Sequence, residues 1–357
     1  MSAPAAAIAA AQAILSTAAV VSCGAFARLS AVLSPVGAGE LSALGVLLLE
    51  PCLAFSALSR LTSSDLAAGG PMLLWAPLHS LVALGLGVCL LPKSPRKGAA
   101  LACAAFGNAG LLPIALVPAL VASPSVSAQG LLFVQVYLVP FRLLVWGLGP
   151  ALLTLDRPKK TDGRQGSPGN GARSSIASWL RMLLPPPSVG SLLGIALAFA
   201  PGAVRSACTS GNLAWALTAI RQVGSAQSPL ALMALGFALA GSAADAHGAG
   251  QKGQKGKPSA TRFTAREIAT VCLIRLMLLP LIHRALCAVL HPTPASSGLL
   301  ADPFALVLLL QACVPTSVSL TPVFQREGID TRQLGPMMLV QYLLAMPAIV
   351  AHVAMAS

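Results

Sequence analysis

The chain has 357 residues, of which 56% are hydrophobic and only 9% are Asp, Glu, Lys or Arg. A soluble domain carries about 25% charged residues to hydrate its surface, so this composition excludes an ordinary soluble domain. The formal net charge of +13 does not indicate a nucleic-acid partner. The basic residues lie between apolar segments and form no basic helix interleaved with aromatic residues.

Ten apolar segments follow one another, each about as long as a helix that crosses a hydrocarbon core. We interpret each as one membrane-spanning helix. The ten predicted helices cover residues 6–28, 40–60, 71–92, 98–121, 128–154, 186–204, 219–241, 266–290, 302–324 and 333–355. Two polar segments, 156–182 and 242–265, interrupt them and are typical of solvated linkers.

The loops between these helices carry an asymmetric charge. Most Lys and Arg residues fall in the loops after odd-numbered helices, which share one side of the membrane, whereas the loops on the other side hold only Arg60 and Arg205. The positive-inside rule therefore predicts that both linkers lie in the cytosol and that both termini are lumenal or extracellular.

Prolines recur at corresponding places in helices two to five and seven to ten. The pairs are Pro51 with Pro229, Pro77 with Pro280, Pro113 with Pro315, and Pro140 with Pro347. An odd number of helices per repeat turns the second repeat over, which is a signature of secondary transporters. This predicts two inverted five-helix repeats, residues 1–155 and 183–357, joined by the basic linker 156–182. The alternative is a ten-helix bundle with coincidental kinks.

Helices four and nine contain residues that favour a break. Gly107, Asn108, Gly110 and Pro113 lie close together in helix four, and Pro315 follows Gln311 in helix nine. Broken ends near the middle of a bilayer must face protein or a water-filled cavity. If the breaks cross, the half-helix N-termini after each proline would present positive partial charge to one point, which suits a carboxylate.

Polar side chains beside these breaks are candidates for binding such an anion. The amides of Asn108 and Gln311 and the hydroxyls of Thr316 and Ser317 would add hydrogen bonds. The alternative is that they only mend the kinks or join neighbouring helices.

Ionisable residues within the apolar segments are a second set of candidates, because a charge inside a membrane is costly. Glu50 would carry a proton, pair with Arg275 or Arg142, or lie beside a water-filled vestibule. Arg275 would neutralise an anionic substrate or brace the bundle. His79 and the corresponding His283 are either packing residues or pH sensors.

The chain contains no nucleotide-binding or hydrolase motif of the G-x-x-x-x-G-K-[ST], H-E-x-x-H or G-x-S-x-G type. Its eight cysteines are scattered, without a C-x-x-C pair. We therefore expect neither an enzyme nor an ATP-driven pump, and no cofactor or metal site.

Four segments resemble the auxin efflux carrier family, and its PIN-LIKES branch more than the long-loop PIN proteins. Residues 50–58 (EPCLAFSAL) are similar to the branch's helix two, and residues 275–281 (RLMLLPL) to its helix eight. Residues 107–116 (GNAGLLPIAL) resemble its Gly-Asn-x-Gly-Asn-x-Pro-Leu stretch, with Leu111 in place of the second Asn. Residues 309–315 (LLQACVP) resemble its Leu-Gln-x-x-x-Pro motif.

The resemblance implies an all-α membrane protein of ten helices in which broken helices four and nine cross at the binding site. It implies export of indole-3-acetate or a related carboxylate by alternating access, and the short linker favours the endoplasmic reticulum over the plasma membrane. His79 stands where the plant pattern has Asn. The predicted substrate-binding residues are Asn108, Pro113, Gln311, Pro315, Thr316 and His79.

Two other functions remain open from the sequence. A cation- or proton-coupled symporter of organic anions or dicarboxylates would share the inverted repeat, and a non-transporting membrane receptor or scaffold would show no flux. The expected partners are a small organic anion and membrane lipid, without nucleic acid, and the sequence is compatible with a homodimer.

Overall fold

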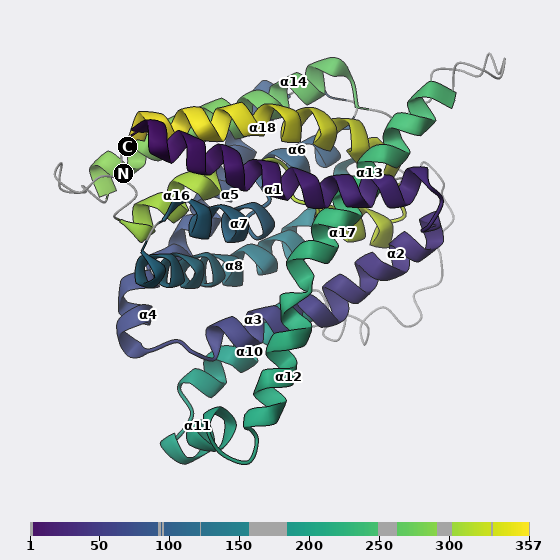
Figure 1. The fold of residues 1–357 in the computed structure, drawn as a ribbon. Coiled ribbons are helices and arrows are strands. Elements are labelled where there is room, and N and C mark those ends of the chain that lie inside the picture. Colours follow the sequence, from purple (N-terminus) through teal and green to yellow (C-terminus); the bar gives the residue numbers. More distant parts are fainter. Residues whose placement is uncertain are drawn as a thin grey trace, which may run out of the picture.

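A computed structural model of the chain describes residues 3–356 apart from 92, 93, 95, 122, 157–183, 249–262, 291–301 and 330. The predicted linker 156–182 lies outside these residues except for Asp156, as does most of the predicted loop 242–265. The described residues are almost entirely helical and contain no strand, which confirms the predicted all-helical class (Figure 1).

The helices of the first predicted half follow the expected order, with a π-helical turn in the second span and a break in the fourth. They are α1 (Ala3–Leu29), α2 (Pro35–Leu44), η1 (Gly45–Leu49), α3 (Glu50–Leu58), α4 (Ser63–Gly69), α5 (Met72–Leu90), α6 (Lys97–Ala105), α7 (Leu111–Leu120), α8 (Pro124–Leu153) and the short η2 (Thr154–Asp156).

The second half has a π-helical turn in its eighth span and a break in its ninth. Its elements are α10 (Pro186–Ala198), α11 (Gly202–Thr209), α12 (Ala214–Ser225), α13 (Gln227–Gly248), α14 (Ala265–Leu273), η3 (Ile274–Leu278), α15 (Leu279–Leu290), α16 (Pro303–Cys313), α17 (Leu320–Arg326), η5 (Thr331–Gln333) and α18 (Leu334–Ala356).

By length and apolar composition, six helical stretches of the described residues can cross a membrane, or seven if the bent pair α10 and α11 is one span. Spans four and nine are absent from this number because each consists of two short helices. The count of ten therefore stays a prediction.

Two predicted boundaries are wrong. The helix predicted at 186–204 ends at Ala198, and the chain turns by 114° into α11, because Pro201 has no N–H group to continue the ladder. Helix α13 runs to Gly248 inside the predicted loop 242–265. The alanines at the start of that segment favour a helix more than its small polar residues disfavour it.

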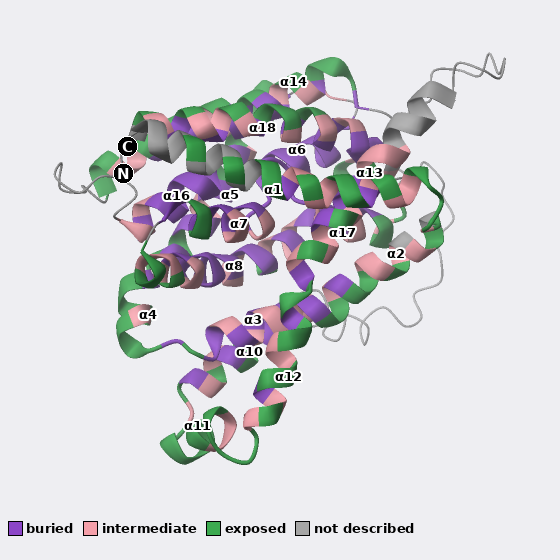
Figure 2. Cartoon of the chain, in the orientation of Figure 1, coloured by how far each residue is buried: buried purple, intermediate pink, exposed green. Residues whose placement is uncertain are grey.

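Apolar side chains face outward in this molecule while several polar ones are buried. Leu74 and Leu343 are 75% and 66% exposed, whereas Arg275 and Gln311 are 2% and 1% exposed. Figure 2 shows the buried positions concentrated in α5, α6, α8 and α16. Exposed apolar helices around a partly polar interior suit lipid as the surrounding solvent.

One group of helices, named here the panel, consists of α1, α2, η1, α3, α10, α12 and α13. Glycines let its backbones approach closely: a Cβ on Gly24 of α1 would lie 1.8 Å from the Met233 carbonyl oxygen, and one on Gly190 of α10 would lie 2.4 Å from the Pro51 carbonyl oxygen. Small residues at helix contacts are a common means of association in membranes, where burial of apolar surface supplies little.

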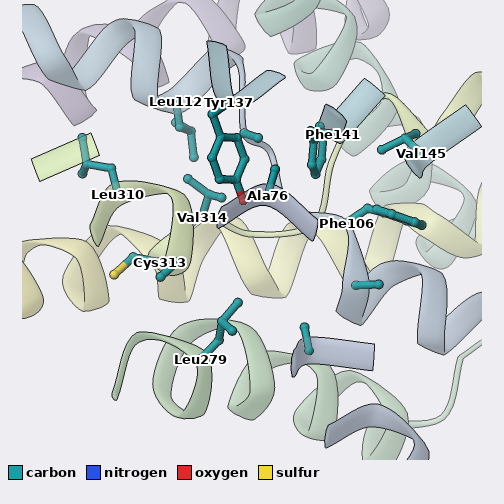
Figure 3. Close-up of a cluster of buried hydrophobic side chains, with 14 of the residues drawn as sticks. Ala76, Phe106, Leu112, Tyr137, Phe141, Val145, Leu279, Leu310, Cys313 and Val314 are labelled. Carbon is teal, nitrogen blue, oxygen red and sulfur yellow. The ribbon is translucent and has the colours of Figure 1, made fainter. Parts of the chain in front are cut away.

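A second group, named here the crossing group, consists of α5 to α8, α14, η3 and α15 to α18. They contain most of the buried core, which Figure 3 shows around Phe106, Tyr137, Phe141 and Val314. The panel packs against this group through α1, which contacts α7 and runs alongside α18 (Figure 1).

Loops after predicted helices three, five, seven and nine meet at one end of the molecule. Ser94 donates to Glu267 at the start of α14, and Arg96 donates to Gln333 over 2.9 Å. Asp156 accepts hydrogen bonds of 2.7 Å from the first backbone N–H groups of α6. The predicted topology requires these loops to lie together, and the side of the membrane that they face stays a prediction.

Candidate functional site

Both predicted breaks are present, but the second halves of the broken helices begin elsewhere than expected. Helix α7 begins at Leu111, before Pro113 and not after it, whereas α17 begins only at Leu320, well after Pro315. Proline is tolerated in the first turn of a helix because the N–H group that it lacks has no helical partner there. Pro113 therefore lies within the start of α7.

The two broken segments cross through backbone hydrogen bonds. Gly107 and Thr316 form an isolated antiparallel bridge. The Asn108 N–H donates to the Pro315 carbonyl over 2.6 Å, and the Ser317 N–H donates to the Phe106 carbonyl over 2.9 Å. Each break thus supplies partners for the other. The antiparallel direction of the bridge is the one expected of two spans that run in opposite directions.

Arg275 of η3 caps the crossing from one side. Its Nε and Nη2 donate to the Val314 carbonyl over 3.0 and 2.8 Å, and its Nη1 donates to the Ala104 carbonyl over 3.4 Å. A Cβ on Gly107 would lie 1.7 Å from Arg275 Nη2, so only glycine leaves room for the guanidinium. No carboxylate among the described residues pairs with Arg275.

Gln311 and Thr316 join the two breaks to their surroundings. Gln311 Nε2 donates over 2.9 Å to the Ala109 carbonyl, the group that Pro113 leaves without a helical donor. The Thr316 hydroxyl bonds the Cys103 carbonyl over 2.9 Å and the Gln341 amide over 2.8 Å. These contacts fit the alternative interpretation that such side chains mend broken helices.

A cavity of about 450 Å³ lies between the panel and the crossing group. Asn108 forms part of its wall at the first break, and Ser317 and Ser319 form part of it at the second. One amide N–H of Asn108 donates to Tyr342 Oη over 2.6 Å, and its Oδ1 accepts from the Leu111 N–H over 3.2 Å. The second amide N–H remains for a ligand.

The rest of the wall is mostly apolar and partly aromatic. Leu111, Leu138, Phe141, Trp146 and Met338 come from the crossing group, and α13 of the panel closes the other side. Cavities of a few hundred Å³ with apolar walls and a small number of polar groups are typical of small-molecule sites.

The charged residues of the cavity wall include two arginines and one glutamate. Arg142 of α8 donates from Nε to Glu50 Oε1 over 3.0 Å. The Arg28 guanidinium lies over the Phe237 ring, 5.2 Å from its centroid. The ordinary charges of these three groups sum to a net positive wall, which favours an anion in a medium of low dielectric constant.

His79 and His283 lie deep in the crossing group, away from the cavity. His79 Nε2 is 3.0 Å from His283 Nδ1, and His79 Nδ1 is 3.1 Å from Tyr137 Oη. The two histidines, which hold corresponding places in the two predicted halves, therefore contact each other directly.

The structure separates the predicted site residues into two sets. Asn108, Glu50 and Ser317 line the cavity. The other predicted residues do not line it and lie within the crossing group; these are Pro113, Gln311, Pro315, Thr316, His79 and Arg275. Sequence reasoning named Arg142 only as a partner for Glu50 and omitted Arg28. The signal for Arg142 was present, since a single arginine inside an apolar helix marks a functional position.

Apolar helices of spanning length, a broken helix crossing and a cavity beside it define an integral, multi-pass membrane protein of the transporter class. The chain belongs to the membrane transport protein family, whose family model matches residues 9–352. This confirms the predicted auxin efflux carrier family, which is a family of transporters and not of enzymes. The match does not distinguish the PIN-LIKES branch. No curated protein matches the chain significantly.

Proposed function

We propose that the chain exports a small organic anion, indole-3-acetate or a related carboxylate, by alternating access. The observation that carries this proposal is the cavity beside the helix crossing, which combines a spare amide donor on Asn108 with two arginines and an apolar wall. An amphipathic aromatic acid matches that combination, since its carboxylate meets the donors and its ring meets the apolar side chains.

The start of α7 adds to the attraction for a carboxylate. Gly110 and Leu111 stand at the N-terminus of this helix and form part of the cavity wall. The N-terminal end of a helix carries positive partial charge, which is little screened where lipid and protein exclude water. Asn108 and this helix end would hold the carboxylate, while Phe141 and Trp146 would contact the ring.

The division into two helix groups supports alternating access. The panel is held together by close backbone contacts at glycines, and the crossing group by its own core and the hydrogen bonds of the two breaks. A movement of one group against the other would open the cavity first to one side of the membrane and then to the other.

The proposed location is the endoplasmic reticulum, with the linker 156–182 and loop 242–265 in the cytosol and both termini in the lumen. The basic residues of these segments support the sidedness. The choice of membrane rests on the shortness of the linker.

The test is efflux of radiolabelled indole-3-acetate from proteoliposomes containing wild type, Asn108→Ala or Asn212→Ala. Asn212 is exposed in the turn between α11 and α12 and serves as the matched control. We expect Asn108→Ala to lower efflux about tenfold or more at low substrate concentration, because hydrogen bonds to charged groups contribute about 1.5–3 kcal/mol. The control should match wild type.

Equal efflux from Asn108→Ala and wild type, both above empty liposomes, would contradict the proposed site. No efflux from wild type would contradict the substrate. A dependence of wild-type flux on a sodium or proton gradient would favour the coupled symporter instead.

A further inference from the structure

Arg142 and Glu50 form an ion pair, and they come from different helix groups. Arg142 lies on α8 of the crossing group and Glu50 begins α3 of the panel. Both line the cavity, with side chains that are 4% and 17% exposed. We propose that Arg142 recognises the carboxylate of the transported anion, and that Glu50 occupies its guanidinium while the cavity is empty. This inference rests on the proposed function.

The bonding of Arg142 leaves N–H groups on which an incoming carboxylate can bind before it replaces Glu50. Its Nε donates to Glu50, and its Nη1 donates over 3.1 Å to the Ser191 hydroxyl. The Ser191 hydroxyl donates in turn to the Pro187 carbonyl over 2.9 Å, so it meets the guanidinium as an acceptor. These bonds use two of the five N–H groups that a guanidinium offers. A planar fork with free N–H groups is the preferred partner of a carboxylate.

Arg275, the other buried arginine considered from the sequence, does not fit this role. It is 2% exposed and donates from all three of its nitrogen atoms to the carbonyls of Val314 and Ala104. The cavity wall contains Arg142, and Asn108 and Ser317 of the crossing, but not Arg275, so a ligand in the cavity meets Arg142 and not Arg275.

Exchange of carboxylates keeps the Arg142 guanidinium paired with a negative charge throughout. An incoming anion takes the place of Glu50 on Arg142, and the Glu50 side chain, which is partly exposed already, turns towards water in the cavity. A neutral molecule of the same shape offers no such exchange and leaves the ion pair closed. Arg142 therefore selects for charge, and Glu50 sets how strongly an anion must bind to replace it.

The same exchange affects the contact between the two helix groups. Both described partners of Arg142 belong to the panel, since Ser191 lies on α10 and Glu50 on α3. Loss of the Glu50 bond when an anion binds removes one of the two polar links that Arg142 makes between α8 and the described residues of the panel. Binding of the anion would thus weaken the contact between the panel and the crossing group, whose relative movement transports the anion.

The experiment compares transport of indole-3-acetate with that of its neutral amide, indole-3-acetamide, in proteoliposomes. The variants are Arg142→Gln, Glu50→Gln and the double variant that carries both changes. Arg284→Gln is the control, because Arg284 lies on α15 outside the cavity and its bond to a described residue is one of 3.5 Å to the Met355 carbonyl. Elution from a size-exclusion column in detergent reports the folding of each variant.

Wild type should transport the acid with a KM at least about tenfold lower than that of the amide, and Arg142→Gln should bring the two KM values together. Glu50→Gln should lower the KM of the acid severalfold, because the internal competitor has lost its charge. The double variant, which leaves no unpaired charge behind, should fold like wild type and still fail to distinguish acid from amide.

Restoration of wild-type discrimination in the double variant would overturn the inference, because it would show that the pair only neutralises itself. An unchanged KM for the acid in Arg142→Gln would overturn it as well. Absence of flux from wild type would instead contradict the proposed function, on which this inference depends, so the two failures are distinguishable.

Discussion

The crossing and the Glu50–Arg142 pair both bury polar groups, but they bond them differently. At the crossing, side chains such as Arg275 and Gln311 bond backbone carbonyls that the breaks have freed, all within one helix group. The ion pair instead joins the two groups and faces the cavity. The difference indicates that the crossing is a fixed frame, whereas the pair is a contact that a ligand can replace.

The largest effect on stability is expected for Gly107→Ala, which tests whether the crossing is a fixed frame. The added Cβ would lie 1.7 Å from Arg275 Nη2 and 2.8 Å from a Val314 side-chain carbon, so the guanidinium must leave the carbonyls that it caps. We expect a loss of about 3 kcal/mol or more in the free energy of unfolding, because a buried charge loses its partners. Thermal unfolding in detergent measures this loss.

Gly110→Ala is the matched control within the same break. A Cβ there would lie 3.7 Å from Leu138 Cδ1, which is an ordinary contact. This variant should unfold within a few degrees of wild type. Similar losses in both variants would show that the break tolerates no side chain at all, and would remove the assigned role of Arg275.

A smaller effect is expected for Gln311→Leu. The change removes the donor to the Ala109 carbonyl. It also removes the Gln311 Oε1 atom, which is buried and has no described hydrogen-bond partner. The two terms oppose each other, so we expect destabilisation of about 1 kcal/mol and a KM for indole-3-acetate within about twofold of wild type. A KM raised about tenfold with unchanged stability would move Gln311 from the frame to the binding site.

The sequence indicates the breaks well because glycine and proline act locally. Gly107 and Gly110 in span four and Pro315 in span nine lie where the helices are interrupted, and each disfavours a helix through its own backbone. The sequence did not predict that α7 begins before Pro113. A proline is compatible with the first turn of a helix and also with the position just before a helix, so the residue type alone does not fix the start.

Partners across the fold could not be predicted in the same way. The sequence left open whether Glu50 pairs with Arg275 or with Arg142. The π-helical turns before Pro51 and Pro280 change which way the side chains of both spans face, and residue types do not reveal such turns. Only the packed structure brings Arg142 to Glu50 and directs Arg275 to the carbonyls of the crossing.

The most direct test of the proposed cavity is equilibrium binding of radiolabelled indole-3-acetate to purified protein with the cavity filled. Ala231 of α13 lines the cavity of about 450 Å³, and a tryptophan there would project its indole ring into the space that a ligand needs. Leu74→Trp places the same side chain on a position that is 75% exposed on the outer surface. We predict that Ala231→Trp abolishes saturable binding while Leu74→Trp binds like wild type. Saturable binding of equal affinity in both variants would contradict the account.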